Sequence, residues 1–325
     1  MSETGEPKVA VVGATGAVGN QLLDLIAARS FAPSGLRLFA TAKGAGETVA
    51  VGDEELLVAN LESPAALAEF DIAFLAVPAI CAAEIISANP GPKLIDLSAA
   101  ARAPSPEAPM VSPGLTARDR IAKLSALGVF AIPHPVAHVL ATCLKALEIP
   151  AGMVAATAML GASSGGKGLV ARTVEQTTDL LSARLDLEED ETQRGFNLFM
   201  REHERSIAGA ATAQVAAMLS PAPELRLQTV SVPVLYGSAI TIEIPADGGG
   251  EVMIELIRGA PGVLLTEEGE PLSVIDAVGQ EAILVQAEPR PHGLSLWCVF
   301  DNVRLAALTA LWIAETLSLR TPPLA

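Results

Sequence analysis

The residues with the clearest chemical potential lie in a glycine-rich stretch near the N-terminus. Four apolar residues, Val9-Ala10-Val11-Val12, run directly into Gly13-Ala14-Thr15-Gly16-Ala17-Val18-Gly19. Apolar residues at helical spacing follow, so the pattern predicts a strand, a tight turn and the start of a helix. Backbone N–H groups at such a turn, together with a helix N-terminus, bind an anion, most often a dinucleotide pyrophosphate. The sequence therefore predicts cofactor contacts from Gly13, Thr15, Gly16, Ala17, Val18 and Gly19.

The end of the second predicted strand bears on the choice between NAD and NADP. That strand, 36–40, runs into Thr41-Ala42-Lys43-Gly44, which contains no carboxylate. In an NAD-binding unit an acidic residue at this corner binds the ribose hydroxyls, whereas a basic residue accommodates the 2′-phosphate of NADP. Lys43 therefore favours NADP, and a solvated loop lysine is the alternative interpretation.

The residues that could act as nucleophiles or metal ligands are few and scattered. The three cysteines are Cys81, Cys143 and Cys298, and none has a metal-binding spacing. Each lies among apolar residues, so we expect reduced thiols in the core rather than reactive ones. His134 and His138 are four residues apart but lack further ligands, so no metal site is predicted. His203 lies in a charged helix and His292 in a loop, and both are predicted to be solvated.

Composition excludes several classes of protein. The chain has 325 residues and a formal net charge of −16, with no cluster of basic residues, which argues against a nucleic-acid partner. No run of about 18 apolar residues is present, and the first residues lack the pattern of a signal peptide, so a cytoplasmic protein is expected. Only 3% of the residues are aromatic, so the core must consist of aliphatic side chains, as in parallel strands covered by helices.

The elements that position these residues alternate between strand and helix. In the first half, strands are predicted at 71–78, 93–98 and 129–133, and a helix at 80–88. This alternation predicts a doubly wound parallel α/β sheet. In the second half, strands are predicted at 154–159, 225–234, 239–244, 282–287 and 294–300, and helices at 165–181 and 201–219. The stretch 252–257 fits either type.

Seven motifs occur in the order found in the aspartate-semialdehyde dehydrogenase family and cover nearly the whole chain. They are Gly13–Gly19, Lys43-Gly44-Ala45-Gly46, Asp96–Arg102, Ala131-Ile132-Pro133-His134-Pro135, Ser164–Gly168, Val232-Pro233-Val234 and Asp301-Asn302-Val303-Arg304. The chain therefore resembles that family. It resembles in particular the bacterial Usg proteins, which share the fold and lack the catalytic cysteine.

The resemblance implies a fold and a reaction. It implies a Rossmann-type dinucleotide-binding domain, residues 1–134 with 301–325, and a second α/β domain, residues 135–300, whose mixed sheet forms a homodimer. The family reaction is the NADP-dependent interconversion of aspartyl phosphate and aspartate semialdehyde in amino-acid biosynthesis. That reaction needs a thiolate that forms a thioester, an imidazole that moves protons, and cations that hold the phosphate and carboxylate groups.

The same resemblance implies that most catalytic groups are missing. It places Pro135 at the position of the nucleophilic cysteine, Ser238 at that of the histidine and Ser231 at that of the substrate-binding arginine. Arg102 matches the phosphate-binding arginine, so a small anionic ligand is expected near it. By analogy with other enzymes, loss of the nucleophile alone costs roughly 10³-fold or more in rate. No residue is therefore assigned a catalytic role.

Three functions remain open from the sequence. The first is a family member that is catalytically impaired or inactive and still binds NADP. The second is an NADP-dependent oxidoreductase acting on another carbonyl substrate without a covalent step, with Tyr236 or His134 as proton donor. The third is a dimeric interaction module with no turnover, for which the fold serves only as a scaffold.

Overall fold

The first predicted strand becomes the central strand of a seven-stranded sheet in the computed structural model. The structure describes residues 6–29, 31–40, 44–98, 108–124, 126–148, 153–187, 191–246, 250–267 and 269–318. The chain forms two compact units, Met1–His134 with Ala306–Ala325, and Pro135–Leu305. The sequence predicts the second boundary at residue 300, a few residues before the one observed.

The sheet of the first unit is parallel except at one edge. Its strands are β1 (Lys8–Val12), β2 (Gly35–Ala40), β3 (Thr48–Val51), β4 (Glu54–Asn60), β5 (Ile72–Leu75), β6 (Lys93–Asp96) and β7 (Val129–Ala131). They lie in the order β3-β4-β2-β1-β5-β6-β7, and β3 is antiparallel to β4. Strand order reverses between β2 and β5 on either side of β1, so the carboxyl end of β1 is a topological switch point.

Helices cover both faces of this sheet. On one face, Val9 and Val11 of β1 pack with α1 (Ala17–Ala28) and with the part of α8 (Asn302–Ser318) that belongs to this unit. On the other face, Ala10 and Val12 pack with α2 (Ala79–Ala88) and the 3₁₀ helix η1 (Pro64–Glu69). Successive residues of β1 thus pack alternately into two separate cores, one on each face of the sheet. This arrangement confirms the doubly wound α/β fold.

Besides η1, two elements of the first unit were not expected from the sequence. One is the β3–β4 hairpin, whose turn contains Gly52 at a φ of +61°. Glycine adopts this left-handed conformation readily, and Gly52-Asp53 between apolar runs is a recognisable hairpin signal. The other is the short helix α3 (Arg118–Leu124), where Arg118 lies 5.5 Å from the ring centre of Trp312 on α8.

The second unit is built on a mixed six-stranded sheet, as expected. Its strands are β8 (Met153–Leu160), β9 (Glu224–Ser231), β10 (Ser238–Pro245), β11 (Val263–Leu265), β12 (Ile283–Arg290) and β13 (Gly293–Phe300). Their order is β11-β12-β13-β10-β8-β9. The two outer pairs are parallel and the three inner pairs antiparallel. β9 therefore forms one edge of the sheet.

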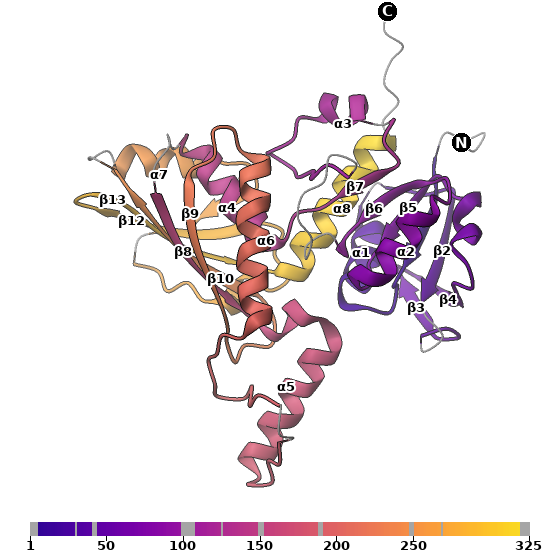
Figure 1. The fold of residues 1–325 in the computed structure, drawn as a ribbon, viewed down its shortest axis with the longest axis horizontal. Coiled ribbons are helices and arrows are strands. Elements are labelled where there is room, and N and C mark those ends of the chain that lie inside the picture. Colours follow the sequence, from indigo (N-terminus) through magenta and orange to yellow (C-terminus); the bar gives the residue numbers. More distant parts are fainter. Residues whose placement is uncertain are drawn as a thin grey trace, which may run out of the picture. The chain divides into compact units, whose positions relative to one another are not determined.

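The helices of this unit are α4 (Pro135–Ala146), α5 (Gly166–Leu181), α6 (Glu202–Met218) and α7 (Gly250–Arg258), with 3₁₀ helices η3 (Ala162–Gly165) and η4 (Val274–Ala277). The ambiguous stretch 252–257 is helical. Residues 135–144 of α4 are all buried, so this helix forms the centre of the unit. Figure 1 shows α6 lying along β9, whereas α5 extends away from the sheet. Among the described residues, no helix is long and apolar enough to cross a bilayer.

Candidate functional site

The turn after β1 is shaped so that only glycine fits at its first position. Gly13 has a φ of +90°, and a Cβ there would lie 2.2 Å from the carbonyl oxygen of Ala76. Its N–H donates to the carbonyl oxygen of Phe39 at 2.7 Å. The turn is thereby held between the ends of β2 and β5, at the switch point of the sheet.

The two later glycines bring the helix N-terminus against this turn. A Cβ at Gly19 would lie 2.2 Å from the carbonyl oxygen of Gly13, so α1 approaches the turn more closely than any side chain permits. Gly16 is the N-cap and makes no side-chain capping hydrogen bond. Within the described part of the chain, the N–H groups of Ala17, Val18 and Gly19 have no acceptor, so they are available to an anion. We call the space between the glycine-rich turn and the start of α1 the cradle. It fits the pyrophosphate of a dinucleotide, because side-chain atoms added at these glycines would fill the space.

The two predicted cations of the site, Lys43 and Arg102, lie outside the described residues. Gly44, which follows Lys43 in the chain, lies against the turn: a Cβ there would be 2.8 Å from Oγ1 of Thr15. Gly44 and the glycine-rich turn are thus neighbours.

In the second unit, four polar side chains gather just after the end of β8 and at the starts of β10 and α8. We call them the hydroxyl cluster: Ser163, Ser164, Ser238 and Asn302. Ser163 Oγ donates to Asn302 Oδ1 at 2.8 Å, and the hydroxyls of Ser164 and Ser238 lie 3.5 Å apart. Ser163, Ser238 and Asn302 are buried. A serine hydroxyl lacks the near-neutral pKa on which general acid–base catalysis depends.

Backbone contacts hold the hydroxyl cluster in place. The N–H groups of Ala162 and Ser163 donate to the carbonyl oxygens of Val234 and Leu235, which fixes η3 against the loop that precedes β10. The carboxylate of Asp301 accepts from the N–H groups of Val303 and Arg304, and its other oxygen accepts from Gly279. Asp301 therefore caps α8 and orients the adjacent Asn302.

The potential thiol and imidazole groups are buried in the core of the unit. Pro135, the first residue of α4, is buried, and Cys143 and Cys298 have no exposed surface. A hydrogen bond with Cys143, together with burial, raises the pKa of Cys298. Burial lowers the pKa of His138 to about 4, so this imidazole is neutral. These facts agree with the expectation that Cys143 is part of the core.

Ser231 lies next to a buried carboxylate that sequence reasoning missed. Its hydroxyl donates to Oε1 of Glu204 on α6 at 2.7 Å, and the N–H of Arg201 donates to Oε2 at 2.9 Å. Burial by itself raises the pKa of Glu204, but these hydrogen bonds outweigh it and the pKa lies below its ordinary value. The end of β9 therefore carries a negative charge. Sequence offers no signal for this, because Glu204 lies in a run of charged residues.

The sheet brings two of the sequence-predicted positions into one row. Leu160 of β8 pairs with Ser238 on one side and with Ser231 on the other. Neighbouring strands are about 4.8 Å apart, so Ser231 and Ser238 lie roughly two strand spacings apart. Tyr236 lies in the loop just before Ser238 and is about half exposed. His203 and His292 are exposed, as predicted.

Comparison with known proteins identifies the ancestry of this fold. Residues 8–124 match the family model "Semialdehyde dehydrogenase, NAD binding domain". A USG-1 protein homolog of Pseudomonas aeruginosa is 32% identical over 95% of this chain and 97% of its own length. The chain belongs to the aspartate-semialdehyde dehydrogenase family. An aspartate-semialdehyde dehydrogenase of Synechocystis is 29% identical with the same two coverages.

Solved structures of the aspartate-semialdehyde dehydrogenase family share both units. A probable aspartate-semialdehyde dehydrogenase from Pseudomonas aeruginosa has a TM-score of 0.83 and 29% identity, covering 96% of this chain and 98% of its own. Aspartate semialdehyde dehydrogenase II from Vibrio cholerae, complexed with ASA, has a TM-score of 0.82 and 25% identity, with the same two coverages. The expected family and fold class are therefore confirmed, and the first unit contains the NAD-binding domain of this family.

Proposed function

We propose that this chain binds NADP but does not carry out the family reaction at a rate typical of its relatives. The observation that carries this proposal is the chemistry at the Ser238 position. Its hydroxyl faces another hydroxyl, Ser164, rather than a group that titrates near neutral pH. The resemblance puts Pro135 at the nucleophile position, and the buried thiols of Cys143 and Cys298 offer no substitute.

The Glu204–Ser231 pair supports the same proposal. By resemblance, the Ser231 position holds the arginine that binds the substrate carboxylate. Here a buried, ionised carboxylate accepts a hydrogen bond from that residue. A second carboxylate brought to this point meets like-charge repulsion instead of a bidentate partner.

The proposed cofactor site consists of the glycine-rich turn and the corner after β2. The backbone at Gly13, Thr15, Gly16, Ala17, Val18 and Gly19 holds the pyrophosphate, and Lys43 meets the 2′-phosphate. Arg102 is proposed to hold a small anion such as phosphate. When bound, the nicotinamide supplies a hydride donor or acceptor.

A direct test is a calorimetric titration with NADP and with NAD, repeated on Lys43→Ala. We expect tight NADP binding that the variant weakens by about tenfold or more, since one charge-assisted phosphate contact is lost. Lys123→Ala is a matched control, because this lysine lies on α3 with its side chain exposed and is not part of the proposed site. No NADP binding by the wild-type chain would contradict the proposal.

A second candidate is an oxidoreductase that reduces another carbonyl compound without a covalent intermediate. It is supported by the exposed phenol of Tyr236, two residues from Ser238, which would serve as the proton donor. This function predicts NADPH oxidation with a panel of small aldehydes and ketones that Tyr236→Phe abolishes. A dimeric interaction module without turnover is the third candidate, and it predicts no oxidation of NADPH with any of them.

The second unit is proposed to form a homodimer, and the protein is proposed to be cytoplasmic. Sedimentation of the purified full chain tests the first statement. A dimer is expected over the concentration range used for activity assays, whereas a monomer would contradict it.

A further inference from the structure

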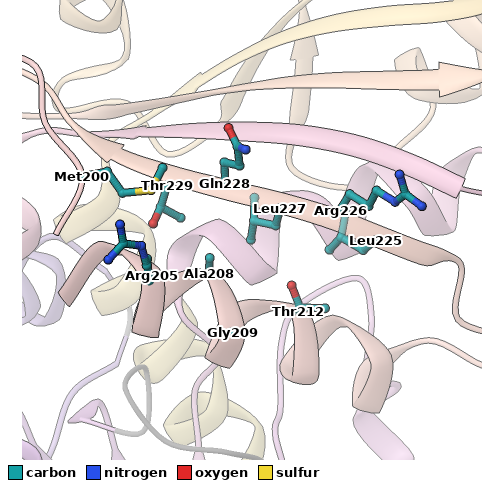
Figure 2. Close-up of a pocket in the computed structure, with 10 residues that line it drawn as sticks. All are labelled: Met200, Arg205, Ala208, Gly209, Thr212, Leu225, Arg226, Leu227, Gln228 and Thr229. Atoms are coloured by element: carbon teal, nitrogen blue, oxygen red, sulfur yellow. The ribbon is translucent and has the colours of Figure 1, made fainter. Parts of the chain in front are cut away.

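Two arginines line the cavity of about 550 Å³ between β9 and α6, but both are already paired (Figure 2). The guanidinium of Arg205 lies 3.7 Å from the carboxylate of Glu202, and that of Arg226 lies 3.4 Å from the carboxylate of Glu224. An anionic ligand needs donors that the protein leaves free. Such donors gather instead in the first unit, where β2 and β4 end side by side.

The turn that begins at Gly44 and ends at Gly46, which we call the Gly44 turn, is held from two sides. On one side, a Cβ at Gly44 would lie 2.8 Å from Oγ1 of Thr15 and 3.1 Å from Cβ of Ala40, the last residue of β2. On the other side, the N–H of Gly46 donates to the carbonyl oxygen of Val58 on β4 at 2.9 Å. The Gly44 turn is therefore fixed against the glycine-rich turn and along the end of β4.

Three hydrogen-bond donors at this place are uncommitted. Within the described part of the chain, the N–H groups of Gly44 and Ala45 have no acceptor. Asn60, the last residue of β4, is exposed, and its amide makes no hydrogen bond to any described residue. Asn60 is the register partner of Ala40, and neighbouring strands are about 4.8 Å apart. Asn60 and Gly44 thus both lie next to Ala40, at the end of the second strand.

These donors differ in kind from the groups that bind NAD. At the end of the second strand, an NAD-binding unit uses a carboxylate, which accepts from the ribose hydroxyls. A backbone N–H only donates, and the amide of Asn60 donates through its NH₂ group without adding charge. A phosphate group is negatively charged and offers strong acceptor oxygens. Donors at this position therefore match the 2′-phosphate of NADP.

We propose that Asn60 selects NADP over NAD by donating a hydrogen bond from its amide to the 2′-phosphate, beside the N–H groups of Gly44 and Ala45. This inference rests on the proposed function, because it concerns the same cofactor. It does not involve the side chain of Lys43.

Two carboxylates belong to the same segments of the chain, Glu47 after the Gly44 turn and Glu62 two residues beyond Asn60. Both side chains are exposed, so water and salt screen their charge and they do not cancel direct hydrogen bonds. Glu62→Gln is therefore a matched control, and it should change the affinity for either dinucleotide by less than about threefold.

The test is a calorimetric titration of the full chain and of Asn60→Asp with NADP and with NAD. This substitution keeps the size of the side chain and replaces a donor with a negative charge. NADP should bind about tenfold or more weakly, because a hydrogen bond is lost and like charges meet. NAD should change by less than about threefold, since its ribose hydroxyls donate to a carboxylate.

A second variant separates loss of the donor from the added charge. Asn60→Ala removes the amide alone, so it should weaken NADP by roughly three- to tenfold and leave NAD within about twofold. Circular dichroism and thermal unfolding establish that the variants fold.

The outcomes distinguish this inference from the function on which it rests. No NADP binding by the wild-type chain would overturn both. NADP binding by the wild-type chain, with the same ratio of NADP to NAD affinity in a folded Asn60→Asp variant, would overturn the role of Asn60 alone. A larger effect of Glu62→Gln than of Asn60→Asp on that ratio would do the same.

Discussion

The hydroxyl of Ser231 lies 2.7 Å from Oε1 of Glu204 and donates a hydrogen bond to it across the junction of β9 and α6. Glu204 is only 4% exposed, so this is a buried charge whose partners are a hydroxyl and a backbone N–H. A buried carboxylate without such donors is costly. The pair therefore fixes both the start of α6 and the charge at the end of β9.

Replacing Glu204 tests this relationship. Glu204→Gln keeps the size of the side chain but loses the charge-assisted hydrogen bonds, so we expect about 1–3 kcal/mol of destabilisation in urea at neutral pH. Glu202→Gln is the matched control, because that side chain is 88% exposed, and it should change stability by less than about 0.5 kcal/mol. Equal effects of the two variants would show that Glu204 is not held as described.

The pH dependence of stability should report His138. Its pKa falls from 6.5 to about 4 on folding because burial disfavours the charged form. Above pH 6.5 the His138 imidazole is neutral in the folded and the unfolded chain, and this contribution to stability is fully present. As pH falls from 6.5 to about 4, only the unfolded chain binds a proton at this residue, so the free energy of unfolding falls by roughly 3 kcal/mol in all. His138→Gln should remove that loss from urea curves recorded between pH 7.5 and 4, whereas His292→Gln, at an exposed position, should leave it in place.

The geometry of the glycine-rich turn predicts a contrast between two alanine substitutions. Gly13 and Gly46 have φ values of +90° and +88°, so alanine is strained at both by about 1–2 kcal/mol. Of these two positions, only Gly13 is one at which an added Cβ would clash with backbone atoms. Gly13→Ala should therefore be less stable than Gly46→Ala and should abolish NADP binding in calorimetry. Equal loss of binding in both variants would contradict the proposed cradle.

The thiols should be largely unreactive in the folded chain. Cys143 and Cys298 are fully buried, and the pKa of Cys298 is raised by a hydrogen bond with Cys143 and by burial. Only the half-buried Cys81 is expected to react with a disulfide reagent before unfolding. Titration in buffer and in denaturant measures this directly. In buffer, we expect the reagent to modify the same number of thiols rapidly in the Cys143→Ala variant and in the wild-type chain. A fast-reacting Cys143 would instead reveal a nucleophile.

The fold could be predicted from sequence because its signals are local and repeated. Apolar strands followed by helical spacing, as at Val9–Val12 and beyond, recur through the first unit and impose a parallel sheet. The β3–β4 hairpin was missed because its strands are only half-buried and so lack the strong apolar pattern of the central strands. The stretch 252–257 became a helix through burial of Ile257 against the sheet.

The site could be predicted only in part. The close approach around Gly13 and Gly19 follows from glycine spacing, which is a local signal. The hydroxyl cluster joins Ser163 to Asn302 across 139 positions of the chain, and the Glu204–Ser231 pair joins a helix start to a strand end. Such contacts depend on tertiary packing, and neither residue type nor spacing specifies them. Lys43 and Arg102 remain predictions.

The central claim is that the chain binds NADP without turning over the family's substrate. The most direct measurement follows the absorbance of reduced nicotinamide when the chain is mixed with NADP, phosphate and aspartate semialdehyde, at an NADP concentration shown by calorimetry to saturate it. The account predicts saturable NADP binding and no phosphate-dependent reduction above the rate without protein. Phosphate-dependent reduction at a rate typical of the family would contradict it.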